Sequence, residues 1–171
     1  MTTTSKTIVD TVRTLARYRM WADQLTFDAV RALPPGEATR ERPTLFKTMI
    51  GTLNHNYLID LIWQAHLEGR DHGFKARNVV LHPELPDLWA AQQVVNQWYI
   101  DWSDRQSQDT LAEIVNFMFI GNEKGAMSRA DILQHVVNHA TYHRGWVAEM
   151  FFQVPARNPA TDLPVFLSRM A

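Results

Sequence analysis

The sequence predicts an all-α protein: a four-helix bundle with a short β-hairpin or irregular insert before the last long helix. Four long segments carry apolar residues at the three-to-four-residue spacing of an amphipathic helix. Proline- and glycine-containing stretches separate them. The chain has 171 residues, about the length of one domain. We therefore expect residues 1–171 to form a single four-helix-bundle domain.

The first two helices are predicted at 7–33 and 45–68. The first ends where Pro34, Pro35 and Gly36 interrupt the helical pattern. The second has Gly69 immediately after it, in the position of a C-terminal cap. Irregular chain is expected between this helix and the third.

The second half of the chain contains two more helices and a different kind of segment. The third helix is predicted at 88–106. Residues 112–127 combine a run of strand-forming residues with a glycine- and asparagine-containing turn, which indicates a hairpin. The fourth helix is predicted at 128–152, because Ser128 and Asp131 have the spacing of an N-terminal capping box. A short helix is expected within 162–167.

Composition excludes several classes of function. Lys and Arg number 17 against 18 Asp and Glu, so the net charge of −1 offers no basic surface for nucleic acid. The absence of cysteine excludes disulfides, zinc–thiolate sites and cysteine nucleophiles. No apolar run reaches the roughly 18 residues of a membrane span, and residues 1–6 do not resemble a signal peptide. We expect a cytoplasmic protein without nucleic-acid or membrane partners.

The fourth helix contains three histidines at four-residue intervals, His135, His139 and His143. Residues four apart share a helix face, so two neighbouring imidazoles can reach one metal ion. His135 and His143 are about 12 Å apart along the helix axis, too far for both to bind the same ion. On a helical wheel His143 falls inside the apolar arc, His139 on its margin and His135 further out. The pair facing the bundle is therefore His139 with His143, and His135 is expected at the rim.

The second helix supplies a candidate third ligand. His55 shares a helix face with Ile59 and Ile62 and is expected to point inward. His66 lies on nearly the same face, but about 16 Å further along the axis, too far to share the ion. His72 and His82 are expected at the surface of the irregular segment. An inward-pointing His55 together with the His139–His143 pair favours a metal site over the alternative, in which these histidines are hydrogen-bonded core residues.

The motifs around these histidines resemble the DinB family, the DinB/YfiT-like group of metalloenzymes. The specific matches are Thr52-Leu53-Asn54-His55 in the second helix and the segment from His135 through His139 and His143 to Arg144-Gly145 in the fourth. Weaker matches are Leu15-Ala16-Arg17-Tyr18 with Trp21-Ala22 in the first helix, and Ala160-Thr161-Asp162-Leu163 near the end. The resemblance covers nearly the whole chain.

The resemblance implies an up-down-down-up bundle that is often a homodimer. It also implies a divalent metal ion, nickel or zinc, held by His55, His139 and His143. One position departs from the family pattern: Trp146 follows Gly145 where glutamine is usual. We expect Trp146 either to narrow the mouth of the site or to form part of a subunit interface.

Three neutral imidazoles leave at least one coordination position open, as in catalytic rather than structural sites. A water or a thiol in that position is activated by the ion. Related enzymes use low-molecular-weight thiols, so the resemblance implies a metal-dependent thiol S-transferase-like or hydrolase-like enzyme acting on an unknown small molecule. A non-catalytic metal-binding stress-response protein is the alternative. A metal-free interaction module is a third hypothesis.

Other polar and aromatic residues are assigned structural roles. Asp60 lies about 140° around the helix from His55, so it is expected to pair with an arginine such as Arg17 or Arg144 rather than to reach the metal. Tyr18 and Trp21 lie three residues apart on one face and are expected to pack in the core or at an interface.

Overall fold

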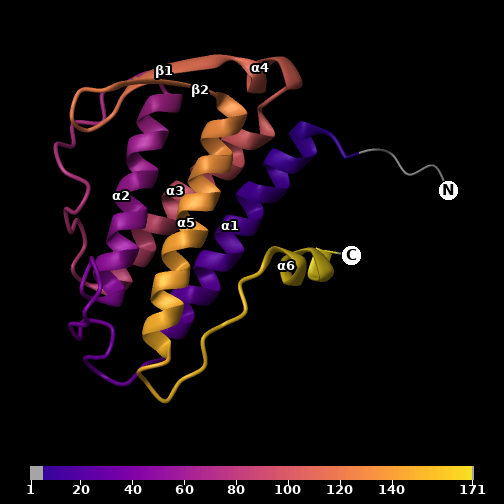
Figure 1. Ribbon diagram of the computed structural model, residues 1–171. Coiled ribbons are helices and arrows are strands. Elements are labelled where there is room, and N and C mark those ends of the chain that lie inside the picture. The colour runs from indigo at the N-terminus through magenta and orange to yellow at the C-terminus, as the bar shows by residue number, and fades with distance from the viewer. Residues whose placement is uncertain (1–5, 171) are drawn as a thin grey trace.

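The computed structural model describes residues 6–170 and shows a bundle of long helices (Figure 1). Two antiparallel strands and two short helices complete the fold. The elements in chain order are α1 (Ile8–Arg31), α2 (Met49–Leu67), α3 (Leu85–Asp104), α4 (Gln108–Ala112), β1 (Ile114–Met118), β2 (Lys124–Ser128), α5 (Arg129–Phe151) and α6 (Leu163–Met170).

The long helices have the up-down-down-up arrangement (Figure 1). Helices α1 and α5 run in one direction, and α2 and α3 run in the other. The segment 68–84 returns along the outside of the bundle, which makes α3 parallel to α2. Helix α1 packs against α3 and α5, and α2 packs against the same two helices. The all-α prediction is confirmed, and the candidate ligands come from the adjacent antiparallel pair α2 and α5.

Side-chain caps begin the first and last long helices, and the one at Ser128 was predicted from the sequence. The hydroxyl of Thr7 accepts a hydrogen bond from the amide of Asp10, whose carboxylate accepts one from the amide of Thr7. The hydroxyl of Ser128 accepts from the amide of Asp131 at the start of α5. These bonds satisfy amides that have no partner inside the helix.

Two predicted boundaries were wrong. Helix α2 begins at Met49 rather than at 45, because Lys47 has a left-handed φ of 62° and Thr48 caps the helix by accepting from the amide of Gly51. Helix α3 begins at Leu85 rather than at 88. Pro86 lies in its first turn, where the amide that proline lacks is not needed.

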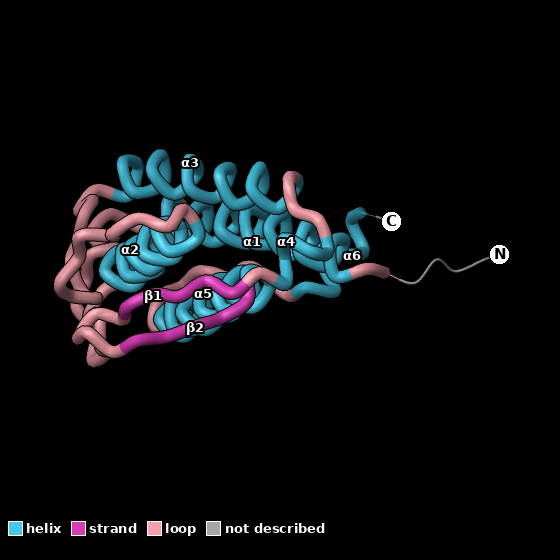
Figure 2. Tube along the Cα trace, turned by 90° about the horizontal axis from the view of Figure 1, so that it is seen from above, coloured by secondary structure: helices cyan, strands magenta, loops and turns pink. Residues whose placement is uncertain are grey.

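The predicted hairpin is present and covers one end of the α2–α5 pair (Figures 1 and 2). Its register pairs Ile114 with Ser128, and Gly121 and Asn122 have positive φ in the turn. Phe117 is buried with its ring centroid 4.8 Å from that of Trp63 and 5.0 Å from that of His66, both on α2. The hairpin therefore closes the bundle over these two side chains.

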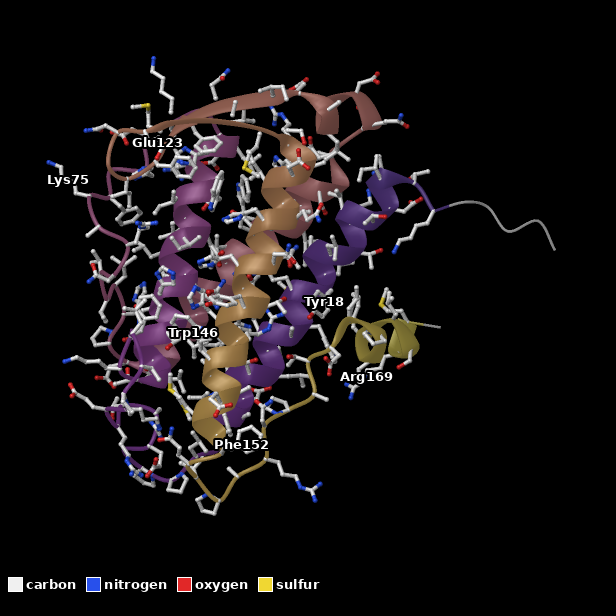
Figure 3. All side chains as sticks on the ribbon, viewed as in Figure 1. Tyr18, Lys75, Glu123, Trp146, Phe152 and Arg169 are labelled. Atoms are coloured by element: carbon white, nitrogen blue, oxygen red, sulfur yellow. The ribbon has the colours of Figure 1, made fainter. Side chains whose placement is uncertain are left out.

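The C-terminal segment packs on α1. Phe166 of α6 is buried, with its ring centroid 5.8 Å from that of Tyr18 and 5.5 Å from that of Trp21. The hydroxyl of Tyr18 donates to the carbonyl of Thr161 at 2.8 Å. The guanidinium of Arg169 lies over the ring of Trp21 at 5.4 Å, and Figure 3 shows Arg169 on α6. Tyr18 and Trp21 thus have the packing role predicted for them.

A buried network of charged and amide side chains joins the four long helices. Arg19 donates from both terminal nitrogens to the carboxylate of Asp60, and from Nε to Asp23 at 3.3 Å. Arg144 of α5 donates to Asp23 at 3.2 Å. Two α3 amides add to the network: Gln92 donates to Asp60, and Asn96 donates to Asp23.

The partner predicted for Asp60 was wrong. It pairs with Arg19, whereas Arg17 pairs with Asp104 near the surface and Arg144 pairs with Asp23. Arg17 and Arg19 differ by about 200° around α1, and only Arg19 faces the interior, where it is 1% exposed.

Within residues 6–170, no helix combines the length and apolar character that crossing a membrane requires.

Candidate metal centre

Three histidines from two helices converge between α2 and α5. Each of His55, His139 and His143 offers one ring nitrogen, and these three atoms lie within 4.8 Å of one another. Nε2 of His55 is 3.2 Å from Nε2 of His139. The ring centroids of His139 and His143 are 4.4 Å apart, as expected for residues one helical turn apart. The sequence singled out the same three residues.

The orientation of His55 is fixed by the irregular segment that follows α2. Nδ1 of His55 donates to the carbonyl of Arg77 at 2.6 Å, which leaves the lone pair of Nε2 free. The adjacent Asn54 holds this segment in place. Its side-chain oxygen accepts from the amides of Leu81 and His82, and its side-chain nitrogen donates to the carbonyl of His82.

The roles of Asn54 and Arg77 were missed by sequence reasoning. A backbone carbonyl from an irregular segment leaves no periodic signal. The only available clue was Asn54, a polar residue on the buried face of a helix.

All three histidines are neutral at pH 7. Burial lowers the pKa of His139 to about 2, with further contributions from the neighbouring His143 and His55. Burial, and then His55, lowers the pKa of His143 to about 4. Burial also lowers the pKa of His55, although its hydrogen bond to Arg77 opposes this. A neutral imidazole has a free lone pair, which is the form that binds a metal ion.

The nitrogens present fit a divalent metal ion. Two nitrogen ligands about 2 Å from a zinc ion at a tetrahedral angle lie about 3.3 Å apart, close to the 3.2 Å between His55 and His139. Nδ1 of His143 is buried without a hydrogen-bond partner among the described residues. Buried polar atoms without partners are rare and call for an explanation such as an ion.

The three histidines lie in the wall of a cavity of about 670 Å³. Phe46 stacks on His55 at a centroid distance of 4.2 Å, and the ring centroid of Trp146 is 4.6 Å from that of His143. Figure 3 labels Trp146 on α5. Trp146 therefore belongs to the cavity wall beside the three histidines, while narrowing of the mouth and a subunit interface both stay predictions.

The other histidines lie outside the ligand group. The ring of His135 is 5.8 Å from that of His139 and 4.7 Å from that of Trp63, so it lines the cavity beyond the three histidines. His66 is buried at the hairpin end. The surface positions predicted for His72 and His82 were wrong, because both are half-buried. The ring of His72 packs edge-on to that of His66, 5.4 Å away.

We expect the metal-free protein to lose stability as the pH falls below 6.5. His66, His139 and His143 have folded-state pKa values of about 4, 2 and 4, against about 6.5 when unfolded. The unfolded chain therefore takes up protons first, between pH 6.5 and 4. The loss is at most about 1.4 kcal/mol per pH unit for each histidine that stays neutral. Urea unfolding at pH 7.5 and 5.0 measures it. Burial raises the pKa of Asp60 to about 6, so its protonation offsets part of this loss. Three buried neutral histidines outweigh one carboxyl, so equal or greater stability at pH 5.0 would still contradict their assignment.

A Gly51→Ala substitution is expected to destabilise the loop beside the site. A Cβ at Gly51 would lie far inside van der Waals contact with the carbonyl oxygen of Phe46, and 3.0 Å from the Thr48 hydroxyl that caps α2. We expect a loss of about 1–3 kcal/mol in urea unfolding. Gly145→Ala is the matched control, because its Cβ meets nothing within 4 Å among the described atoms. It should stabilise α5 by up to about 1 kcal/mol. Similar losses in both variants would argue against the steric explanation.

The fold and the site together define a class: helical-bundle proteins whose facing helices present a three-histidine group able to hold a metal ion. Comparison with known families identifies it further. The model of the DinB family matches residues 1–170, and the chain belongs to this family. It is similar to "Protein DinB" of Bacillus subtilis (strain 168), with 26% identity over 160 residues, covering 90% of this chain and 91% of the relative.

Proposed function

We propose that this protein is a divalent-metal-dependent enzyme that transfers a low-molecular-weight thiol to a small electrophilic molecule. The observation that carries the proposal is the group of three neutral histidines in the wall of a cavity. The group has three members among the described His, Cys, Asp and Glu side chains, which is the ligand count of open, catalytic sites rather than closed structural ones. Zinc and nickel both suit imidazole ligands.

The absence of cysteine supports an external thiol. The chain has no sulfur nucleophile of its own, so any sulfur that reacts must enter with a ligand. A divalent ion at this position supplies Lewis-acid activation of a thiol or a water. In the transferase reaction a sulfur–carbon bond forms, the leaving group departs with the bonding electron pair, and the thiol proton passes to solvent. In the hydrolase alternative, water takes the place of the thiol.

The chain's own residues hold and shield the reacting groups. The carbonyl of Arg77 fixes the ring of His55. Phe46 and Trp146 cover His55 and His143 with aromatic surface, which reduces access of bulk water to this part of the cavity. No carboxylate lines the cavity within the described part of the chain, so the lining offers no acidic side chain as a general base.

Metal-dependent conjugation tests the proposal. Wild-type protein would be stripped with chelator, reloaded with zinc or nickel, and assayed for conjugation of cysteine to 1-chloro-2,4-dinitrobenzene and for hydrolysis of p-nitrophenyl acetate. We expect conjugation only in the loaded protein, and none in His139→Ala. Metal-dependent ester hydrolysis alone would favour the hydrolase. Stoichiometric metal without either reaction would favour the non-catalytic stress-response protein. We also propose that the protein is a homodimer and that its second substrate is a low-molecular-weight thiol, as the family resemblance implies.

A further inference from the structure

The cavity extends well beyond the three histidines, along the groove between α2 and α5. These helices are antiparallel: His55 contacts His143 at a centroid distance of 4.6 Å, whereas Trp63 contacts His135 at 4.7 Å. The cavity is lined from His55 to His66 on α2. Eleven residues of helix span about 16 Å. The cavity is therefore elongated, with the three histidines toward one end and His66 at the other.

The wall between these two ends is mainly apolar, although His135 of α5 also lines it beside Trp63. Ile59, Ile62 and Trp63 line it from α2, and Phe119 and Ile120 line it from the hairpin turn. Among the described lining residues, the one with a formal charge at pH 7 is Arg77, on the segment that holds His55. A volume of about 670 Å³ is within the usual range for a site that takes a small organic molecule.

His66 is a polar group without a partner at the far end of this apolar wall. It is 9% exposed and packs against Trp63, His72 and Phe117. Its ring makes no hydrogen bond to another side chain or carbonyl in residues 6–170, and its nitrogens are not among the fully buried atoms, so they are accessible from the cavity that His66 lines. Burial, and then His72, lowers its pKa to about 4, so the ring is neutral at pH 7 and offers one donor and one acceptor.

We infer that the cavity binds an elongated, mainly apolar molecule whose reacting end lies at the three histidines and whose far end carries an uncharged hydroxyl or carbonyl group that hydrogen-bonds to His66. His66 is then a specificity-determining residue that does not touch the reacting atoms. The inference rests on the proposed function only for the reacting end. The apolar wall and His66 select the rest of the molecule whether or not a metal ion is bound.

Hydroxamic acids of increasing length test the inference, because the hydroxamate binds a metal ion and the tail probes the wall. Acetohydroxamic, 6-phenylhexanohydroxamic and 6-(4-hydroxyphenyl)hexanohydroxamic acids would be titrated calorimetrically into zinc-loaded and zinc-free wild-type protein. We expect the phenylhexano tail to lower Kd by about 100-fold or more relative to acetohydroxamic acid. The para-hydroxyl should lower it up to about 10-fold further. Equal affinities across the series would overturn the inference.

Two substitutions separate the role of His66 from its packing. In His66→Phe the gain from the para-hydroxyl should vanish while the gain from the tail remains. In His66→Gln, which keeps a donor and an acceptor, much of the hydroxyl gain should return. An unchanged hydroxyl gain in His66→Phe would overturn the assignment of His66. If either variant unfolds, the tail-length series in wild-type protein still decides whether the cavity selects elongated molecules.

The zinc-free titrations keep the inference distinct from the proposed function. If neither zinc nor nickel binds, the proposed function fails, yet a tail-length dependence in zinc-free protein would still support the elongated apolar site. If zinc binds and acetohydroxamic acid binds as tightly as the longer compounds, the inference fails, while the proposed function is still decided by the conjugation assay.

Discussion

A His139→Ala variant is expected to lose the bound divalent ion. His139 contacts both other members of the group, with Nε2 3.2 Å from that of His55 and its ring 4.4 Å from that of His143. Only two imidazole ligands, His55 and His143, then remain in the group. Substituting residues that only orient metal ligands typically weakens binding about 10–100-fold. Loss of a ligand itself should exceed about 100-fold, so metal content should fall from near one ion per chain to a small fraction.

Plasma mass spectrometry on untagged protein measures this loss, after reloading with zinc or nickel and removing excess ion. His135→Ala is the matched control, because His135 is one turn away on the same helix, is also half-buried, and lies outside the ligand group. His66→Ala on α2 is a second control. Both should keep the ion. A wild-type protein that holds no metal after reloading would eliminate the metal site, and equal loss in all three variants would point to general unfolding.

The second large effect concerns the buried arginine of α1. Arg19→Met removes the cation between Asp60 and Asp23 and leaves two carboxylates in the interior with one remaining arginine, Arg144. Removing one partner of a buried ion pair typically costs about 3–5 kcal/mol, because the other charge stays buried without compensation. Arg19 is 1% exposed, so solvent cannot replace its hydrogen bonds. We expect a loss of this size in urea unfolding of the metal-free protein.

Arg17→Met provides a control on the same helix. Arg17 also pairs with an aspartate, Asp104 at 2.8 Å, but both side chains are more than one-third exposed. Exposed pairs contribute about 0–1 kcal/mol. A large difference between the two variants is therefore expected from burial alone. If Arg17→Met and Arg19→Met had similar effects, the buried network would not be a main source of stability.

Features set by local spacing could be predicted from the sequence. The cap at Ser128 depends on a residue three positions further on, and the pairing of His139 with His143 depends on one helical turn. His55 was assigned an inward position by the same periodicity. That these residues bind a metal stays a prediction.

Features that depend on how distant segments meet could not be predicted. Arg17 and Arg19 are equally plausible partners for Asp60 until the rotation of α1 in the bundle is known. The carbonyl of Arg77 comes from an irregular segment, where no periodicity applies. The cavity length follows from the antiparallel contact of α2 with α5, and this contact cannot be predicted from the sequence of either helix alone.

The distance along the chain between the candidate ligands determines when the site can form. His55 and His139 are 84 residues apart, and their rings meet only after α5 has docked against α2. Before that, an ion would have to close a long flexible loop at a considerable entropic cost. Assembly should therefore be ordered, with folding of the polypeptide first and loading of the ion afterwards. A bound ion would link two helices across half the chain, and escape of α5 from the bundle should then become the slow step in unfolding.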